Sequence, residues 1–435
     1  MRGRACHRPR DCVSSPPGDR DLTDRTVIVA GAGIVGVATA LWLRRDGFDV
    51  MLVDRAGPGA GTSYGNAGVL AAGSIVPVTV PGLLRRAPAM LLDRDQPLFL
   101  RWRHLPRLLP FLRRYLAQAR HVEHIADGLH ALLHDAVEQH RALAAGTPAA
   151  AYLRDDDWIY GYADRAAYEA DAYGWGIRRA HGVPFEEMTA DALAAHDPAL
   201  AGRFGFGVRL PHHGRVTDPG AYVAALAGAF EAEGGTFRRA TITDLRIEDG
   251  TCTGLRTDAG LLTADRYVLT LGAWSGPLAA KLGITVPMES ERGYHVEYVN
   301  PSVRLTGPLM VASGKFAVNS MEGRLRAAGI VEFGGLDAPP SRAPFDLLRR
   351  QMRDLFPDMT YDRVDEWMGH RPSTADSLPV IGPAPRAPNV LLGYGHQHIG
   401  LTGGAKTGRW LAQLAGDRTP NTDLGAFAPD RTIRG

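Results

Sequence analysis

The sequence predicts an α/β protein in which a Rossmann-like domain is joined to a second domain built on an antiparallel sheet. Three observations lead to this prediction. A strand, a glycine-rich turn, a helix and a second strand follow one another close to the N-terminus. Strand patterns dominate residues 287–333. The chain has 435 residues, which is too long for one simple core and suits about two domains.

The N-terminal unit has the pattern of a β-α-β element. "TVIVA" (Thr26–Ala30) is an apolar, β-branched run typical of a buried strand, and "GAGIVG" (Gly31–Gly36) follows it directly. A helical pattern continues to about Asp46, and Gly47 is expected to end the helix. "FDVMLVD" then predicts a second buried strand, which ends in Asp54.

The glycines of this unit favour dinucleotide binding over a purely structural turn. Gly31 permits a tight bend, Gly33 lets backbone approach a pyrophosphate, and Gly36 lets helix and strand pack closely. The free N–H groups at the start of the helix suit phosphate oxygens. Asp54 stands where a carboxylate accepts hydrogen bonds from ribose hydroxyls, and its charge argues against a 2′-phosphate. The pattern alone does not separate NAD from FAD.

Composition narrows the class of protein. The formal net charge is only +2, so no global field favours nucleic acid and no such partner is expected. Cys6, Cys12 and Cys252 form an odd, sparse set, which indicates a reducing compartment and suggests no metal site. Residues 1–24 lack the apolar core of a signal peptide and are predicted to be a disordered extension. No apolar run of about 18 residues occurs, so a cytoplasmic protein is expected.

Residues 84–145 show a helical pattern that contains an unusually basic stretch. No acidic residue occurs between Gln96 and Arg120. Six arginines alternate there with apolar and aromatic residues: Arg101, Arg103, Arg107, Arg113, Arg114 and Arg120. Two interpretations stay open: peripheral contact with the inner face of an anionic membrane, or, preferred, a helix pair packed on its own domain with a solvated basic face.

The remaining elements follow from shorter patterns. Residues 150–212 are expected to form short strands and loops. A helix is predicted from Pro219 to the glycines at Gly234 and Gly235, and short strands are predicted from residue 236 to 271. "FDLLRRQMRDLF" predicts one more helix.

The stretch "GLTGGAKT" (Gly400–Thr407) differs from the P-loop pattern at one position, where Ala405 replaces the last glycine. A P-loop also needs a later acidic strand to hold Mg²⁺, and too little sequence follows for one. We therefore interpret "VLLGYG" as a strand and Gly400 as the start of a helix.

Three segments carry a resemblance to a known family. They are "TSYGNAG" (Thr62–Gly68), "LGAWSGPLA" (Leu271–Ala279) and "HRPSTADSLPVIGPAPRAPNVLLGYGHQHIGLTGGAKTGRWLAQL" (His370–Leu414). In order and spacing they resemble the D-amino-acid oxidase superfamily of flavoproteins, especially bacterial D-amino-acid dehydrogenases, with glycine oxidase and sarcosine oxidase as relatives. The likeness runs from about Thr26 to the C-terminus and is loosest from Leu84 to His212.

The resemblance implies FAD. Binding is expected to be non-covalent, because no cysteine lies near the C-terminal flavin loop, where sarcosine oxidases carry their covalent link. The helix that begins at Gly400 is expected to point its N-terminus at the flavin N1–C2=O edge, where it stabilises reduced flavin. The predicted cofactor-binding residues are Gly31, Gly33, Ile34, Val35, Gly36, Asp54, Arg55, Ser63, Asn66, Ala67, Gly68, Gly272, Trp274, Gly395, His398, Ile399, Gly400, Leu401 and Thr402.

The resemblance also implies a substrate site. Arg371, in the "RP" motif, is predicted to bind the substrate carboxylate, and Tyr294 is predicted to donate to the same carboxylate. The alternatives are an interdomain salt bridge for Arg371 and a core position for Tyr294. His396 is placed with them at the catalytic centre, in polar or packing contact with the flavin.

The implied reaction is oxidative deamination of a D-amino acid to a 2-oxo acid and ammonia, with electrons passed to quinone or an electron-transfer protein. An oxidase or dehydrogenase of glycine, sarcosine, proline or hydroxyproline is the alternative, as is an FAD-binding subunit of a larger complex. The predicted FAD-binding domain comprises residues 25–83, 213–280 and 365–435. The predicted substrate domain comprises residues 84–212 and 281–364.

Overall fold

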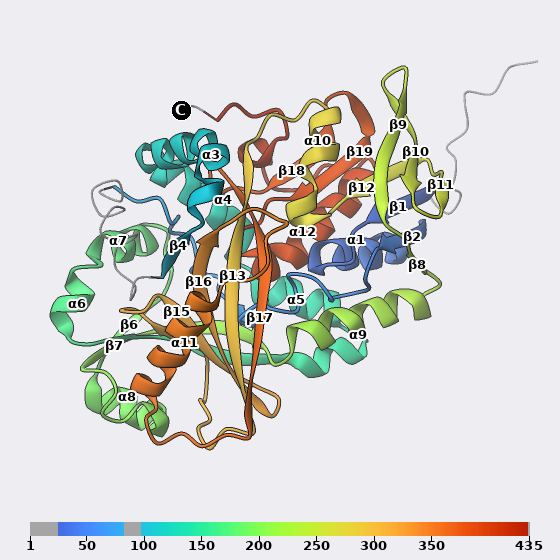
Figure 1. The fold of residues 1–435 in the computed structure, drawn as a ribbon. Coiled ribbons are helices and arrows are strands. Elements are labelled where there is room, and N and C mark those ends of the chain that lie inside the picture. The colour runs from blue at the N-terminus through green and yellow to red at the C-terminus, as the bar shows by residue number, and fades with distance from the viewer. Residues whose placement is uncertain (1–24, 82–96, 434–435) are drawn as a thin grey trace, which may run out of the picture.

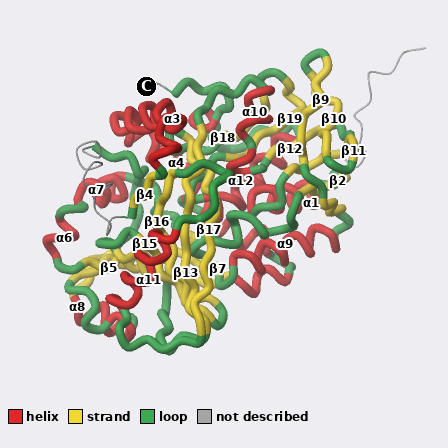
Figure 2. The backbone as a smooth tube through the Cα atoms, in the orientation of Figure 1, coloured by secondary structure: helices red, strands yellow, loops and turns green. Residues whose placement is uncertain are grey.

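The computed structural model describes residues 25–81 and 97–433 (Figure 1). The predicted disordered extension, Cys6, Cys12 and the first part of the predicted helical segment at 84–145 lie outside the described residues. Two large sheets stand side by side, with helices packed around them (Figures 1 and 2). No described helix is both long and apolar enough to cross a bilayer.

The first sheet has six strands in the order β18-β19-β12-β1-β2-β8. Their bounds are β1 Thr26–Ala30, β2 Asp49–Asp54, β8 Thr236–Arg239, β12 Arg266–Leu269, β18 Val380–Ala384 and β19 Ala387–Tyr394. All pair in parallel except β18, which is antiparallel to β19. The predicted Rossmann-like sheet is therefore confirmed, and the two strands predicted at its N-terminal end are β1 and β2.

Both faces of this sheet are covered, which explains why β1 is almost entirely apolar. Val27 and Val29 face a core formed with the helices α1 (Ile34–Arg45), α9 (Pro219–Ala232) and α12 (Gly400–Ala415). Ile28 and Ala30 face a second core, formed with α10 (Gly276–Lys281) and the small sheet of β9 (Ile242–Glu248), β10 (Thr251–Thr257) and β11 (Gly260–Leu262). Strands buried on both faces have no polar side to show in their sequence.

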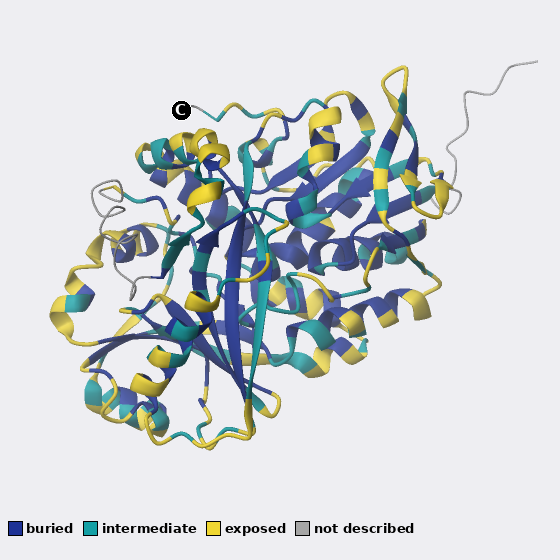
Figure 3. Cartoon of the chain, viewed as in Figure 1, coloured by how far each residue is buried: buried dark blue, intermediate teal, exposed yellow. Residues whose placement is uncertain are grey.

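Glycines let α12 pack directly on α1. A Cβ on Gly404 would lie 2.8 Å from Ile34 Cγ1, and a Cβ on Gly408 would lie 2.7 Å from the Ala38 Cβ and the Thr39 nitrogen. Figure 3 shows both helices largely buried. The first residues of both helices, Ile34 and Val35 of α1 and Gly400 and Leu401 of α12, lie at one cavity.

The second sheet has ten strands and is mostly antiparallel, as predicted. Its main order is β17-β13-β16-β15-β14-β5-β7-β3, with β4 beside β16 and β6 beside β7. Their bounds are β3 Val69–Leu70, β4 Leu98–Leu100, β5 Leu153–Tyr162, β6 Glu186–Thr189, β7 Phe206–Val216, β13 Met288–Val299, β14 Leu309–Val311, β15 Phe316–Met321, β16 Arg324–Phe333 and β17 Arg363–Thr374. α11 (Arg342–Leu355), which includes most of the predicted "FDLLRRQMRDLF" helix, packs against β13 and β16.

The prediction of only short strands and loops for residues 150–212 is wrong. The structure places the long strands β5 and most of β7 there, with the helices α6 (Arg165–Glu169), α7 (Ala172–Ala180) and α8 (Ala190–His196) between them. The half of β5 that begins the strand is polar and partly exposed, which hides the alternation of a strand. The three helices have five to nine residues, too few for a clear helical period.

The basic stretch folds as α3 (Leu105–Ala117), followed by α4 (Val122–Leu133) and α5 (Ala136–Ala144). Leu108, Phe111 and Tyr115 of α3 are buried against Phe333 and Ala375. The packed-helix interpretation of this stretch therefore agrees with the structure. The division into domains stays a prediction; β7 and β17 run across its boundaries at 212/213 and 364/365.

Candidate functional site

A cavity of about 560 Å³ lies where the strands of the six-stranded sheet end. Predicted cofactor residues make up part of its wall: Gly31, Gly33, Ile34, Val35, Asp54, Arg55, Ser63, Asn66, Gly272, Trp274, Gly400 and Leu401. His396, predicted to be catalytic, also lines it. Ligands of open parallel sheets bind outside the carboxyl ends of the strands, and this cavity has that position.

The glycine loop has the shape that its sequence requires. Gly31 has a φ of +102°, and a Cβ there would lie 2.5 Å from the carbonyl oxygen of Thr270. A Cβ on Gly36 would lie 1.8 Å from the Gly31 oxygen, so only glycine allows α1 to start so close to β1. Gly33 differs, because a Cβ there would meet only Ser63 Oγ, at 3.3 Å, and it borders the cavity.

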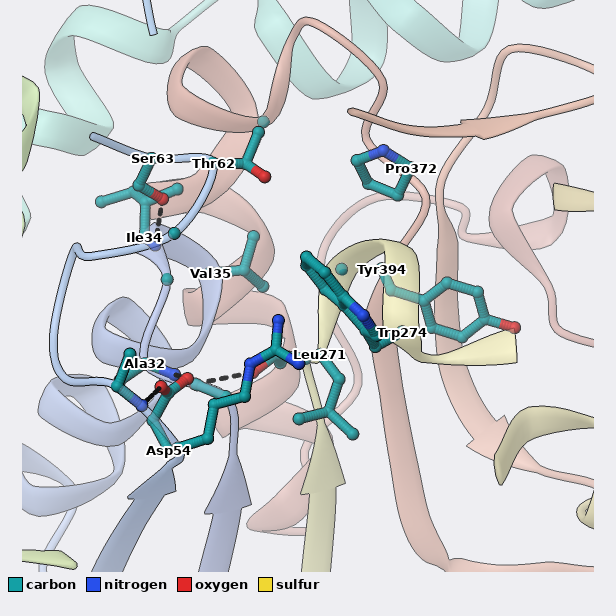
Figure 4. A pocket seen from close by; sticks show the side chains of 18 of the residues that line it. Ala32, Ile34, Val35, Asp54, Thr62, Ser63, Leu271, Trp274, Pro372 and Tyr394 are labelled. Atoms are coloured by element: carbon teal, nitrogen blue, oxygen red, sulfur yellow. Dashed lines mark hydrogen bonds between the residues drawn. The ribbon is translucent and has the colours of Figure 1, made fainter. Parts of the chain in front are cut away.

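Two side chains fix the backbone of this loop (Figure 4). Asp54 Oδ2 accepts a hydrogen bond from the Ala32 N–H at 2.9 Å, and Ser63 Oγ accepts one from the Ile34 N–H at 3.0 Å. Asp54 Oδ1 accepts from the N–H groups of Ala56 (2.7 Å) and Gly57 (3.2 Å). The carboxylate thus organises two turns of backbone at the edge of the cavity.

Aromatic and cationic groups form another wall of the cavity. The guanidinium of Arg55 lies 4.1 Å from the ring centroid of Trp274. Trp274 in turn meets His370 of β17 edge to face, with ring centroids 5.3 Å apart. This contact connects the cavity wall with the ten-stranded sheet.

The segment "TSYGNAG" is tied to the ten-stranded sheet by several hydrogen bonds. Thr62 Oγ1 donates to the His370 oxygen at 2.8 Å, and Asn319 Nδ2 donates to the Ala67 oxygen at 2.9 Å. Arg326 Nη1 donates to the backbone oxygens of Tyr64 and Asn66. The predicted residues Ala67 and Gly68 serve this attachment and do not line the cavity.

The N-terminus of α12 reaches the cavity through Gly400 and Leu401. His140 bonds the first turn of this helix, with Nε2 2.8 Å from the Leu401 oxygen and Nδ1 2.8 Å from the hydroxyl of Tyr222. Complete burial lowers the pKa of His140 to about 4, so the ring is neutral. The N-termini of α12 and α1 line the same cavity, so the positive ends of two helix dipoles lie at it.

His396 stands on the loop between β19 and α12, with Nε2 2.9 Å from Thr407 Oγ1. Burial lowers its pKa to about 3, and the ring therefore stays neutral near pH 7. His398 is exposed although protein closely surrounds it; burial by that protein, opposed by Glu291, lowers its pKa.

Several other predicted cofactor residues support the cavity without lining it. Gly36 lies beneath the loop, Gly395 turns the chain with a φ of +88°, and Ile399 caps α12. Thr402 Oγ1 accepts a hydrogen bond from the Ala71 N–H at 3.3 Å. These roles in holding the backbone agree with their place in the motif, while direct contact with a cofactor stays a prediction.

Sequence reasoning missed other residues that line the cavity. They include Thr62, Ala240, Thr241, Ile242, Thr243, Thr270, Leu271, Pro372, Gly393, Tyr394 and Gln397. Thr270 and Leu271 end a predicted strand. This position could have indicated that they line the cavity, because parallel strands end at the edge of the sheet where ligands bind. Residues 240–243 had no such signal, because they reach the cavity only through the pairing of β8 with β2.

Arg371 lies beside the cavity but does not line it. Its neighbour Pro372 is part of the wall. Arg371 Nη1 donates to Glu291 Oε1 at 3.1 Å, and Nη2 donates to the Gly329 oxygen at 3.0 Å. The side chain of Arg371 is 16% exposed, and that of Glu291 is 4% exposed. Arg371 thus forms a salt bridge with Glu291, while the interdomain character of this bridge and the substrate role of Arg371 both stay predictions.

Tyr294 lies on the opposite face of the ten-stranded sheet from Arg371. Glu291 pairs with Arg371 and Tyr294 pairs with Met368 in an unbroken register, and side chains alternate between faces. The Tyr294 hydroxyl donates to Glu332 at 2.6 Å and accepts from the Ser341 N–H at 3.0 Å. This geometry does not support the expectation that Tyr294 and Arg371 bind one carboxylate; it matches the core alternative.

Comparisons with known proteins agree with this architecture. A family profile described as FAD-dependent oxidoreductase (DAO) matches residues 26–414. The chain is 38% identical to a D-amino-acid oxidase of Bradyrhizobium diazoefficiens, over 94% of this chain and 99% of that protein. It is 32% identical to a D-amino acid dehydrogenase of the same organism, over 93% and 98%. The fold resembles glycine oxidase from Geobacillus kaustophilus, with a TM-score of 0.72 and 22% identity over 94% of this chain and all of that one.

Proposed function

Because the chain belongs to the family of FAD-dependent oxidoreductases, we propose that it oxidises D-amino acids to 2-oxo acids and ammonia. The relatives named D-amino-acid oxidase and D-amino acid dehydrogenase support this choice of substrate, since each is matched over nearly its whole length. The observation that carries the proposal is Arg371, a guanidinium held beside the cofactor cavity.

The cavity fits FAD. A side chain at Gly33 is absent from the space that a pyrophosphate needs, the first residues of two helices line the cavity, and Asp54 ends the strand where a ribose belongs. When bound, FAD supplies the oxidising group, because its flavin accepts hydride from the substrate Cα. The α12 N-terminus, with Gly400 and Leu401 in the cavity wall, would supply a positive dipole to stabilise the negative charge of a reduced flavin.

We assign the substrate carboxylate to Arg371. A guanidinium binds a carboxylate in two parallel hydrogen bonds, and such a pair fixes the direction of the Cα–H bond. Two of its N–H groups already bond Glu291 and Gly329, which hold it in place beside Pro372 of the cavity wall. Its remaining N–H groups are available to a ligand.

Positioning accounts for this reaction better than general-base catalysis does. Among the described residues that line the cavity, Asp54 is the only carboxylate, and its oxygens bond backbone N–H groups. A bound neutral amine loses hydride from Cα and becomes an imino acid, which water converts to the 2-oxo acid and ammonia. We propose that the electrons then pass to quinone or another carrier.

The test is anaerobic reduction of the bound flavin by a panel of D- and L-amino acids, with glycine, sarcosine, proline and hydroxyproline included. We expect D-amino acids to bleach the flavin absorbance fastest. Bleaching only by glycine, sarcosine or the L-imino acids would contradict the proposed substrate class. Failure of every amine in the panel would point instead to a subunit that needs a partner.

The electron acceptor is tested separately, by turnover in air with and without a quinone analogue. We expect the quinone analogue to support turnover and little hydrogen peroxide to form. Stoichiometric peroxide without the quinone would identify an oxidase.

We further propose that the exposed face of the 102–120 stretch rests on an anionic membrane. Trp102 is 61% exposed and Leu109 is 54% exposed. Five arginines are exposed beside them without a described partner: Arg103, Arg107, Arg113, Arg114 and Arg120. Arg101 is not part of this face, because it bonds Ser341 and pairs with Glu332. Apolar side chains among unpaired arginines suit an interface with acidic lipid.

Co-sedimentation with vesicles tests this surface. We expect binding to vesicles that contain phosphatidylserine, little binding to neutral vesicles, and loss of binding at high salt. Arg107→Glu with Arg113→Glu should abolish it, and Arg353→Glu on the distant helix α11 is the matched control. Binding that ignores both lipid charge and salt would contradict the proposal.

A further inference from the structure

Glu291 is a buried carboxylate on the face of the ten-stranded sheet that borders the cofactor segment. On β13 it shares this face with Gly293, His295 and Glu297, because side chains alternate along a strand. His295 Nδ1 lies 3.1 Å from the Gly65 oxygen of the segment "TSYGNAG". Glu291 and Arg371 pair across β13 and β17. They therefore lie on the face of the sheet that contacts the segment "TSYGNAG".

The Glu291–Arg371 ion pair is closely packed by its neighbours. The guanidinium of Arg371 lies against Gly293, where a Cβ would come 2.5 Å from its Cζ atom. Ser373 Oγ donates to Glu291 Oε2 at 3.0 Å, while Arg371 holds Oε1. Ser373 also pairs with the backbone of His396, a residue of the cavity wall. Ser373 thus connects Glu291 to the loop that lines the cavity.

Part of this pair is accessible from the cavity side. The side chain of Arg371 is 16% exposed, and its chain neighbour Pro372 lines the cavity. A ligand that reaches the guanidinium of Arg371 is therefore close to Glu291 as well, because the two side chains are hydrogen-bonded at 3.1 Å. Because burial lowers the pKa of His398, its ring adds no positive charge there near pH 7.

The charges of this pair impose a condition on the ligand. Arg371 alone attracts any carboxylate, but Glu291 sits at its guanidinium and repels a second carboxylate at short range. A ligand that carries a cationic or hydrogen-bond-donating amine beside its carboxylate offsets this repulsion. A carboxylate has about four acceptor positions. The structure shows two hydrogen bonds to Glu291, which leaves positions for an amine.

We infer that Glu291 is a second substrate-binding residue, which accepts hydrogen bonds from the amino group while Arg371 binds the carboxylate. This arrangement selects amino acids over carboxylic acids that have no hydrogen-bond donor beside the carboxylate, such as fatty acids. The inference rests on the proposed function, and it explains why a substrate-binding arginine carries a buried counter-ion.

The experiment compares an amino acid with the acid of the same skeleton that lacks the amine. D-Alanine and propionate form such a pair. The Kd of propionate is measured from the change in flavin absorbance, and the apparent Kd of D-alanine from the saturation of anaerobic flavin reduction. Both are measured for wild type, Glu291→Gln and Glu291→Asp, after FAD content and Tm have been checked.

Glu291→Gln keeps the shape and removes the charge. We expect it to weaken D-alanine about tenfold or more, the size of one charge-assisted hydrogen bond, and to leave propionate binding unchanged or tighter. Glu291→Asp should keep the preference for the amino acid, because the charge remains. Glu289→Gln is the matched control on the same strand and face; its partner is His104, at 3.3 Å, and both ligands should bind it as they bind wild type.

Two results with the Glu291→Gln variant would overturn the inference. Equal weakening of D-alanine and propionate by Glu291→Gln would show that Glu291 only positions Arg371. Unchanged binding of both would show that the ion pair is purely structural. Wild-type enzyme that no amino acid reduces would refute the proposed function itself and the inference with it, and this result is seen before any variant is made.

Discussion

Asp54→Asn exchanges one carboxylate oxygen for an NH₂ group and leaves the shape of the side chain unchanged. In the structure Oδ2 accepts from the Ala32 N–H at 2.9 Å, and Oδ1 accepts from Ala56 at 2.7 Å and Gly57 at 3.2 Å. The amide of asparagine has only one acceptor oxygen, so it can keep either the bond to Ala32 or the bonds to Ala56 and Gly57, but not both. Its NH₂ group, a donor, then faces the backbone N–H of the other side, which is also a donor.

The structure sets the expected size of the effect. A hydrogen bond to a charged group contributes about 1.5–3 kcal/mol, which corresponds to roughly 10- to 150-fold in a binding constant. The bond to Ala32 lies within the protein, so part of this loss should appear as a lower Tm of the apoprotein. The rest should appear in FAD affinity, because the same oxygens face the predicted ribose.

Titration of apoprotein with FAD, followed by flavin fluorescence, measures the affinity, and thermal unfolding measures the stability. Asp49→Asn is the control, since Asp49 starts the same strand and is exposed. An FAD Kd within about threefold of wild type, together with an unchanged Tm, would refute the assigned role of Asp54.

Three further changes test other parts of the site. Gly33→Val should give folded but colourless protein, because a Cβ there meets only Ser63 Oγ at 3.3 Å while its branches enter the space for the pyrophosphate; full yellow colour would contradict this. Arg371→Lys should lower turnover without loss of FAD, and Arg371→Ala should cost at least about 3 kcal/mol in kcat/KM; near-normal anaerobic bleaching by the best substrate would argue against the assignment. Acid should destabilise the fold, because burial lowers the pKa of His140 to about 4 and of His396 to about 3. The unfolded chain takes up protons at both histidines below about pH 6.5, where the folded chain does not, so Tm should fall as pH drops from about 6.5 towards 4; a Tm that rises over this range would count against neutral buried rings.

The sequence alone was enough to predict the elements whose sequence patterns are local. Strand β1, the glycine loop, α1 and β2 occupy about 30 consecutive residues, and each has its own pattern. Gly47 ends α1 as expected, with a φ of +92° and its N–H bonded to the Arg44 oxygen. The strand before Gly400 and the helix after it were equally readable, because a glycine loop separates two clear periods.

The site could not be completed from the sequence, because its other half depends on distant pairing. Glu291 meets Arg371 across 80 residues, through the register of β13 and β17. A shift of one residue in that register would have put Tyr294 on the cofactor side instead. The strand patterns of residues 287–333 therefore predicted a strand around Tyr294 but not the face that each side chain takes.

Lys406 separates the two interpretations of "GLTGGAKT" most directly. In a P-loop this lysine binds phosphates, but here its Nζ donates to the Ala131 oxygen and to Asp135 Oδ1, both at 2.7 Å. The side chain is 7% exposed and fastens α12 to the helices α4 and α5. Lys406 does not line the cofactor cavity.

Lys406→Met should therefore lower stability and leave FAD in place. We expect a loss of about 1–3 kcal/mol in the free energy of unfolding, because two bonds of a charged donor disappear while Asp135 keeps access to water. Urea unfolding of the apoprotein measures this, and FAD titration measures the affinity. Arg409→Met, on an exposed position of the same helix, is the control for a lost surface charge. If Lys406→Met instead abolished FAD binding at unchanged apoprotein stability, a phosphate role for this lysine would have to replace the anchoring role.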